Sequence, residues 1–137
     1  MKKKIAIIGS GIAGLTLASL LQTNSNFEFV VYEKEESLNL DEGFGIQLSV
    51  NSVFILNKIG FNQLSKNEKY NPSKLDFCSI NYNKICDLDL TAFNSANSKY
   101  TTLKRSITFT NVIFKGFYSF YQRLDFTIIS LFRFRIP

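Results

Sequence analysis

The sequence predicts an α/β fold whose first part is a strand–helix–strand unit within residues 5–33. A continuous apolar run at residues 5–8 is typical of a strand buried on both faces of a parallel sheet. Residues 12–23 carry leucine and alanine at helical spacing, and both residue types favour helices. Residues 27–32 are rich in aromatic and β-branched side chains, which favour a second strand.

The turn between the first strand and the helix holds a Gly-x-Gly-x-x-Gly motif. Its residues are Gly9, Ser10, Gly11, Ile12, Ala13 and Gly14. We expect Gly9 to permit the tight turn, Gly11 to let a pyrophosphate approach the backbone, and Gly14 to let the helix pack close to the strand. The N–H groups and positive dipole end of the helix would then face the phosphates.

An acidic residue completes this pattern at the end of the second strand. Glu33 lies about 20 residues after the motif, where a carboxylate accepts hydrogen bonds from ribose hydroxyls. The same carboxylate would repel a 2′-phosphate, so NADP is disfavoured in this site. Together these elements predict a Rossmann-like βαβ fold that binds the ADP half of a dinucleotide. A glycine-rich turn that binds nothing is the alternative, and the motif does not choose between NAD and FAD.

Downstream of this unit the sequence predicts a loop, a strand and a helix. Polar residues 34–42 indicate the loop, and the glycine-led run 43–48 indicates a turn that enters a short strand. Residues 49–59 have an apolar pattern that fits a helix, with serine and asparagine near its start as candidate caps. Gly60 follows where a helix C-terminus favours a left-handed residue.

The second half of the chain predicts a small β-hairpin and one further strand. Residues 75–80 and 85–90 are the expected strands of the hairpin, and a polar turn joins them. Residues 99–104 are expected to form a strand that leads into Arg105, which is the only arginine in residues 1–106.

Four short stretches after the motif share their pattern with one known family. They are Val30-Val31-Tyr32-Glu33-Lys34, Gly43-Phe44-Gly45-Ile46-Gln47-Leu48-Ser49-Val50-Asn51, Leu56-Asn57-Lys58-Ile59-Gly60 and Leu103-Lys104-Arg105-Ser106. In this combination the chain resembles the FAD-dependent aromatic-ring monooxygenases, the family of para-hydroxybenzoate, salicylate and ubiquinone-pathway hydroxylases. The resemblance covers about residues 3–106.

The resemblance implies a cofactor and a reaction. It implies that FAD binds with its adenosine end at the glycine motif and Glu33, and that Lys34, Gly45, Gln47 and Arg105 also contact the cofactor. In the family, NAD(P)H and O2 are used to hydroxylate a small, aromatic substrate. The flavin performs that chemistry while the protein positions and shields it, so no residue of this chain is assigned a catalytic role.

The resemblance ends where the composition changes. We expect residues 1–106 to form an incomplete FAD-binding domain, because the sequence has neither the Gly-Asp nor the Asp-Gly dipeptide of the family. Residues 107–137 contain nine aromatic residues and a single acid, and Ile107–Phe114 is compatible with a strand. We hypothesise that this tail is a frameshifted or otherwise aberrant product. A genuine segment that covers a partner, a membrane surface or a sheet edge is the alternative.

Composition excludes several other functions. The chain has no histidine, which excludes Ser-His-Asp and Cys-His nucleophile systems and most transition-metal sites. Its net charge of +5 is mild and its basic residues are scattered, so no nucleic-acid partner is expected. A membrane partner is not expected either, because no uncharged apolar run is long enough to span a bilayer.

The sequence contains two cysteines. Cys78 and Cys86 form no recognisable motif and are expected to be reduced thiols in a cytoplasmic protein.

The sequence predicts neither the substrate nor the oligomeric state. Two alternatives to the monooxygenase portion remain open: a non-catalytic nucleotide-binding or interaction module, and a fragment of an NAD-dependent oxidoreductase.

Overall fold

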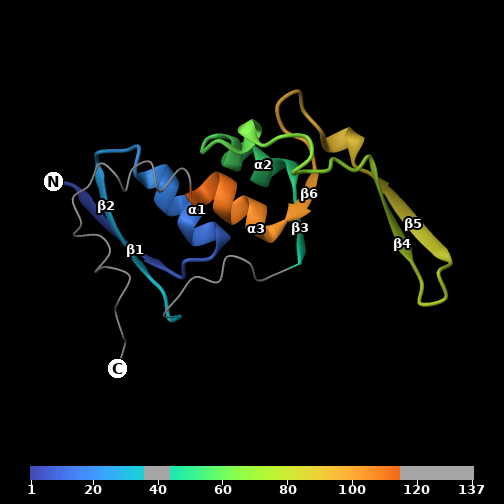
Figure 1. Ribbon diagram of the computed structural model, residues 1–137, viewed down its shortest axis with the longest axis horizontal. Coiled ribbons are helices and arrows are strands. Elements are labelled where there is room, and N and C mark those ends of the chain that lie inside the picture. The colour runs from blue at the N-terminus through green and yellow to red at the C-terminus, as the bar shows by residue number, and fades with distance from the viewer. Residues whose placement is uncertain (36–43, 115–137) are drawn as a thin grey trace.

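A parallel pair of strands with a connecting helix forms the N-terminal part of the molecule. The computed structural model describes residues 1–35 and 44–114, and Figure 1 shows their arrangement. Strands β1 (Lys3–Ile8) and β2 (Phe27–Tyr32) pair in parallel along their whole length. Helix α1 (Ile12–Leu21) connects them, so the predicted strand–helix–strand unit is confirmed.

One face of this strand pair is packed and the other is open. Ile7, Ala18 and Val31 are buried between the strands and α1, with Ile5, Leu21 and Phe29 packed around them. The expectation that residues 5–8 are buried on both faces is wrong for the described part of the chain. Ile8 is 80% exposed, because side chains alternate along a strand and α1 covers only one face.

A second, antiparallel pair of strands lies beside a short helix. Strand β3 (Gly45–Leu48) pairs with β6 (Thr101–Lys104), and Gly45 lies opposite Lys104. Helix α2 (Val50–Asn57) follows β3 directly, and the hydroxyl of Ser49 caps it by accepting a hydrogen bond from the Ser52 N–H. Gly60 has a φ of +100°, the left-handed conformation predicted after this helix, and leads into the 3-10 turn η1 (Phe61–Gln63).

The segment after β6 is helical, so its interpretation as a possible strand is wrong. Helix α3 (Arg105–Ile107) continues into the π-helical segment η3 (Thr108–Phe114). Val112 is buried with residues of β3, α2 and β6, whereas Ile113 is buried against Leu15 of α1. This burial outweighs the strand preference of the aromatic and β-branched side chains. The helix therefore joins the N-terminal unit to the second strand pair (Figure 1).

The predicted hairpin is present and projects from the rest of the molecule (Figure 1). Strands β4 (Lys74–Cys78) and β5 (Lys84–Asp89) pair antiparallel, and a bulge follows the pair formed by Phe77 and Cys86. Every residue of β5 is exposed. On one face, two lysines and two aspartates form ion pairs, two of them across the strands and two within a strand: Lys74, Asp76, Lys84 and Asp87. The 3-10 turn η2 (Thr91–Phe93) follows.

Candidate functional site

The glycines of the turn between β1 and α1 have three different environments. Gly9 has a φ of +97°, a conformation that other residues rarely adopt. A Cβ at Gly14 would lie 2.0 Å from the carbonyl oxygen of Gly9, so any side chain there would force the helix away from the strand. A Cβ at Gly11 would meet nothing within 4 Å, so the space in front of this residue is open. The turn is thus closely packed at Gly14 and open in front of Gly11.

The N-terminus of α1 lies at Gly11, on the open side of the turn. The first hydrogen bond of the helix runs from the Leu15 N–H to the Gly11 carbonyl. Gly11 is the N-cap residue and provides no side-chain cap. The N–H groups of Ile12, Ala13 and Gly14 therefore have no partner within the helix and carry its positive dipole end. This arrangement is chemically suited to an anionic group such as a phosphate.

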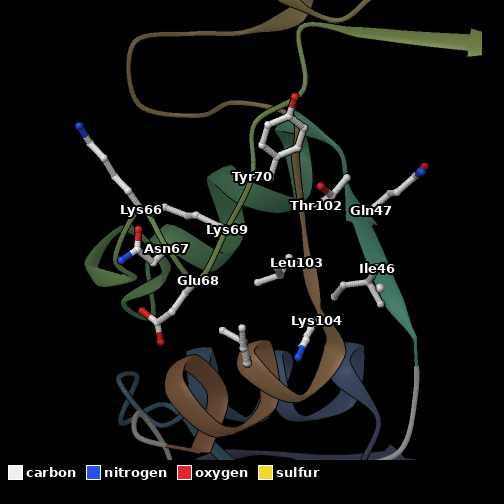
Figure 2. Close-up of a pocket in the computed structure, with 12 residues that line it drawn as sticks. Ile46, Gln47, Lys66, Asn67, Glu68, Lys69, Tyr70, Thr102, Leu103 and Lys104 are labelled. Atoms are coloured by element: carbon white, nitrogen blue, oxygen red, sulfur yellow. The ribbon is translucent and has the colours of Figure 1, made fainter.

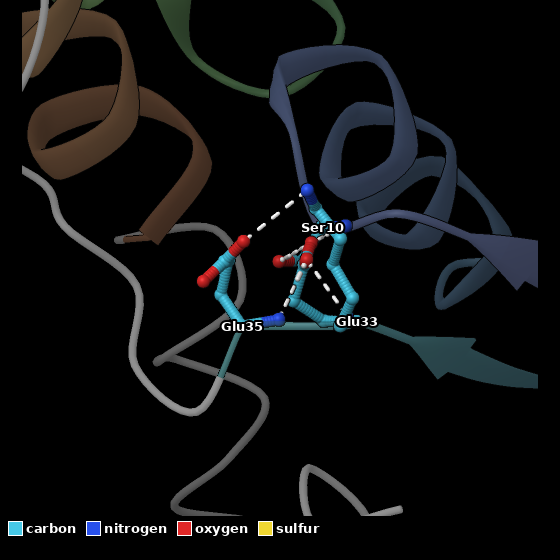
Figure 3. A network of polar contacts seen from close by, with 4 residues as sticks. Ser10, Glu33 and Glu35 are labelled. Atoms are coloured by element: carbon cyan, nitrogen blue, oxygen red, sulfur yellow. Dashed lines mark hydrogen bonds and ion pairs between the residues drawn. The ribbon is translucent and has the colours of Figure 1, made fainter. Parts of the chain in front are cut away.

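Glu33 is bound to the turn rather than projecting freely from the end of β2 (Figure 3). One carboxylate oxygen, Oε2, accepts hydrogen bonds from the N–H and from the hydroxyl of Ser10, each at 2.7 Å. The other oxygen, Oε1, accepts from the N–H groups of Lys34 at 2.8 Å and Glu35 at 3.1 Å. These contacts, with those of Ser10 the strongest, lower the pKa of Glu33 to about 2. Glu33 is therefore a carboxylate at neutral pH.

The other residues predicted to contact a cofactor form a second group around β3 and β6. Gly45 and Gln47 are both in β3, and the Gln47 side chain accepts a hydrogen bond of 2.8 Å from the Tyr100 hydroxyl. Arg105 begins α3, and its N–H donates to the Phe44 carbonyl at 3.3 Å. The structure thus brings Gly45, Gln47 and Arg105 to one strand pair. Lys34, by contrast, extends into solvent and pairs with its neighbour Glu35 at 3.3 Å.

An open pocket with a volume of about 750 Å³ lies against this second group (Figure 2). Three apolar side chains line it, namely Ile46, Leu103 and Ile107, and residues 66–70 lie across it from β3. Its polar lining residues are Gln47, Lys66, Asn67, Glu68, Lys69, Tyr70, Thr102 and Lys104. The volume lies within the range typical of small-molecule sites. Sequence reasoning missed residues 66–70 because a polar connection carries no local signal of the strands against which it folds.

The described residues hold neither a cluster of metal ligands nor a membrane-spanning helix. Residues 1–35 and 44–114 contain no group of three or more acidic, cysteine or histidine residues placed to hold a metal ion. In the same ranges, no helix is long and apolar enough to cross a membrane.

The comparisons define the class of fold first. Residues 7–40 match the family described as the NAD(P)-binding Rossmann-like domain. The structure resembles 2,6-dihydroxypyridine-3-hydroxylase from Arthrobacter nicotinovorans with a TM-score of 0.51 and 20% identity, over 88% of this chain and 27% of that one. It resembles the tetracycline destructase Tet(51) with the same TM-score and 15% identity, over 85% of this chain and 28% of that one. The predicted Rossmann-like α/β fold is therefore confirmed.

The proteins that are similar in sequence have more specific names than the family of the fold. The chain is 46% identical over 59 residues to the 3-amino-4-hydroxybenzoate 2-monooxygenase PtnB3 of Streptomyces platensis, which is 43% of this chain and 14% of the relative. It is 40% identical over 57 residues to the FAD-dependent monooxygenase ntnA of Nectria sp, which is 42% of this chain and 7% of the relative. The resemblance to flavin-dependent monooxygenases is thus confirmed over part of the chain, and the match spans a small fraction of these relatives' length.

Proposed function

We propose that this chain is the FAD-binding N-terminal portion of a flavin-dependent monooxygenase. The observation that carries the proposal is the turn between β1 and α1, with its three distinct glycine environments and Glu33 bound beside it. The similarity to enzymes named as FAD-dependent and as aminohydroxybenzoate monooxygenases supports FAD over NAD in this site. The substrate would be a small aromatic compound, with NAD(P)H and O2 as co-substrates.

The residues present fit the adenosine and pyrophosphate parts of FAD. The open space in front of Gly11 and the N–H groups at the start of α1 suit a pyrophosphate. Glu33 is ionised, and a carboxylate accepts hydrogen bonds from ribose hydroxyls more strongly than a neutral oxygen does. We propose that the motif residues Gly9 to Gly14, together with Glu33 and Lys34, hold this half of the cofactor. Gly45, Gln47 and Arg105 are proposed to lie along the other half.

The contribution of this chain is binding and orientation. When bound, the flavin supplies the redox and oxygen chemistry of hydroxylation. The turn would fix the position of the cofactor through its backbone N–H groups, and Glu33 would fix the ribose. We assign no residue of the chain to the chemical step and propose no metal.

A binding measurement tests this proposal directly. Isothermal titration calorimetry of the full chain with FAD and with ADP is expected to show binding of both. Gly11→Val is expected to abolish it, because the side chain fills the space that the pyrophosphate needs, whereas Ala96→Val in an exposed loop is the matched control. Full affinity for ADP in the Gly11→Val variant would contradict the proposed site.

A non-catalytic nucleotide-binding module is the second candidate. The described residues contain the elements that hold ADP, and the chain matches only 14% of the length of the aminohydroxybenzoate monooxygenase. The two candidates differ in turnover. Oxidation of NAD(P)H by the FAD-loaded chain in the presence of a hydroxybenzoate favours the monooxygenase, and tight FAD binding without oxidation favours the module.

The domain limits and the cellular location remain proposals. We propose that residues 1–106 are an incomplete FAD-binding domain and that residues 107–137 are an aberrant tail, although Val112 and Ile113 in that tail are buried in the described structure. The DNA of the gene tests this. The hypothesis fails if neither alternative frame after codon 106 encodes a helix and a Gly-Asp motif. We also propose a cytoplasmic location, which agrees with the free cysteines Cys78 and Cys86.

A further inference from the structure

The carboxylate of Glu33 has no acceptor position left for a ligand. A carboxylate offers about four lone-pair positions, two on each oxygen. In the structure Oε2 receives both donors of Ser10, and Oε1 receives the N–H groups of Lys34 and Glu35. A ribose hydroxyl that donates to Glu33 must therefore displace one of these four donors.

With the Glu33 carboxylate held in its place, only one of the four donors can leave without moving the backbone. Three of them are main-chain N–H groups, and that of Ser10 follows directly on the positive-φ turn at Gly9. The hydroxyl of Ser10 is the exception, because rotation about its Cα–Cβ bond moves it away from Oε2. Ser10 is only 1% exposed, so in the empty site its hydroxyl donates to Oε2 rather than to water. The Ser10 hydroxyl is therefore the donor that a ribose hydroxyl would replace on Glu33.

We propose that Ser10 is a latch on the nucleotide site: its hydroxyl occupies the acceptor position on Glu33 that a ribose hydroxyl takes, and rotates away when an adenosine nucleotide binds. The inference rests on the proposed function, and it deepens that function by naming what the ligand must displace. It makes the hydroxyl of Ser10 a group that opposes nucleotide binding, while the backbone of Ser10 stays part of the turn that holds the phosphates. The hydroxyl thereby sets the dependence of the affinity on the ribose hydroxyls. The latch also keeps the carboxylate in place while the site is empty.

Calorimetry with two probes tests the latch on the full chain. The probes are ADP and 2′,3′-dideoxy-ADP, which lacks both ribose hydroxyls. The variants are Ser10→Ala and Ser19→Ala, the latter a matched control whose buried hydroxyl donates to the Leu15 carbonyl within α1. Ser10→Ala is expected to bind ADP about two- to tenfold more tightly, the range that one hydrogen bond gives. It should leave the affinity for dideoxy-ADP unchanged, and Ser19→Ala should change neither.

A second variant and a structural control protect the test against a folding artefact. Ser10→Cys replaces the hydroxyl oxygen by a somewhat larger sulfur that donates only a weak hydrogen bond, so its affinity for ADP should lie between those of the wild type and Ser10→Ala. Far-ultraviolet circular dichroism establishes that each variant is folded.

Three results would overturn the latch. Equal affinity of Ser10→Ala and the wild type for ADP would show that the hydroxyl is a bystander. Weaker binding by Ser10→Ala would show that the hydroxyl supports the ligand, either by direct contact or by orienting Glu33. Absence of ADP binding in every variant, including the wild type, would remove the proposed function and the latch with it. The first two results leave the proposed function intact.

Discussion

Two strand pairs of this molecule show how differently a two-stranded sheet can be held. The parallel pair of β1 and β2 is fixed by buried apolar side chains against α1 and by the polar contacts of Glu33. The antiparallel pair of β4 and β5 lies in solvent and is joined on one face by ion pairs. Since exposed ion pairs contribute little and a lone hairpin is marginally stable, the first pair should determine the stability of the fold.

The largest effect is expected at the turn of the first pair. Gly14→Ala should lower the free energy of unfolding by about 3 kcal/mol, because the new Cβ would collide with the Gly9 carbonyl and separate α1 from β1. Gly11→Ala is the matched control, and it should leave stability nearly unchanged since its Cβ meets open space. Urea denaturation measures both. Equal stability of the two variants would show that close packing at Gly14 is not required.

A matched pair of leucine substitutions compares the two regions directly. Leu15→Ala should cost about 3 kcal/mol, because Leu15 is buried against Ile113. Leu88→Ala in β5 should change the free energy of unfolding by less than about 0.5 kcal/mol, because Leu88 is 40% exposed. Chemical denaturation followed by circular dichroism gives both values. A larger effect at Leu88 would mean that the hairpin is part of the main folding unit.

The main pH dependence of stability should come from the first pair, although the pKa values of Asp76, Asp87 and Asp89 in the exposed hairpin are lowered as well. The pKa of Glu33 is lowered from 4.5 to about 2, so Glu33 binds a proton less readily in the folded than in the unfolded chain. Its contribution is therefore complete above pH 4.5 and is lost as the pH falls towards 2. Thermal unfolding between pH 6 and 2.5 should show a loss that Glu33→Gln reduces. Glu28→Gln, on the exposed part of β2, should leave the profile as in the wild type.

The smallest effect should be that of salt on the hairpin. The ion pairs of Lys74 and Lys84 with Asp76 and Asp87 are exposed, so 1 M NaCl should screen them. We expect local fraying of β4 and β5 in amide hydrogen exchange, with no change in the midpoint of global unfolding. A fall in that midpoint in salt would show that the hairpin contributes to the stability of the whole fold.

The parts of the fold that the sequence could predict are those that a local pattern forces. The positive φ of Gly9 and the close approach at Gly14 follow from the spacing of the motif, and the Ser49 cap and Gly60 follow from helix chemistry. Each of these depends on a few neighbouring residues. A short pattern therefore specified them without knowledge of the tertiary fold.

The failures are features that depend on contacts between distant segments. The hydrogen bond between Ser10 and Glu33 forms only because the ends of β1 and β2 lie side by side in the folded chain. The helix at residues 105–114 is decided by the burial of Val112 and Ile113, against the strand preference of its residues. The pocket lining at residues 66–70 likewise arises only when this connection folds against β3 and β6.

The register of the hairpin has a practical consequence for handling the protein. Cys86 lies opposite Phe77, whereas Cys78 is the next residue along β4 and projects from the other face. Because the two exposed thiols lie on different faces of the hairpin, air oxidation is not expected to join them within one molecule. Without a reducing agent, oxidation should instead join separate molecules into disulfide-linked dimers and larger species.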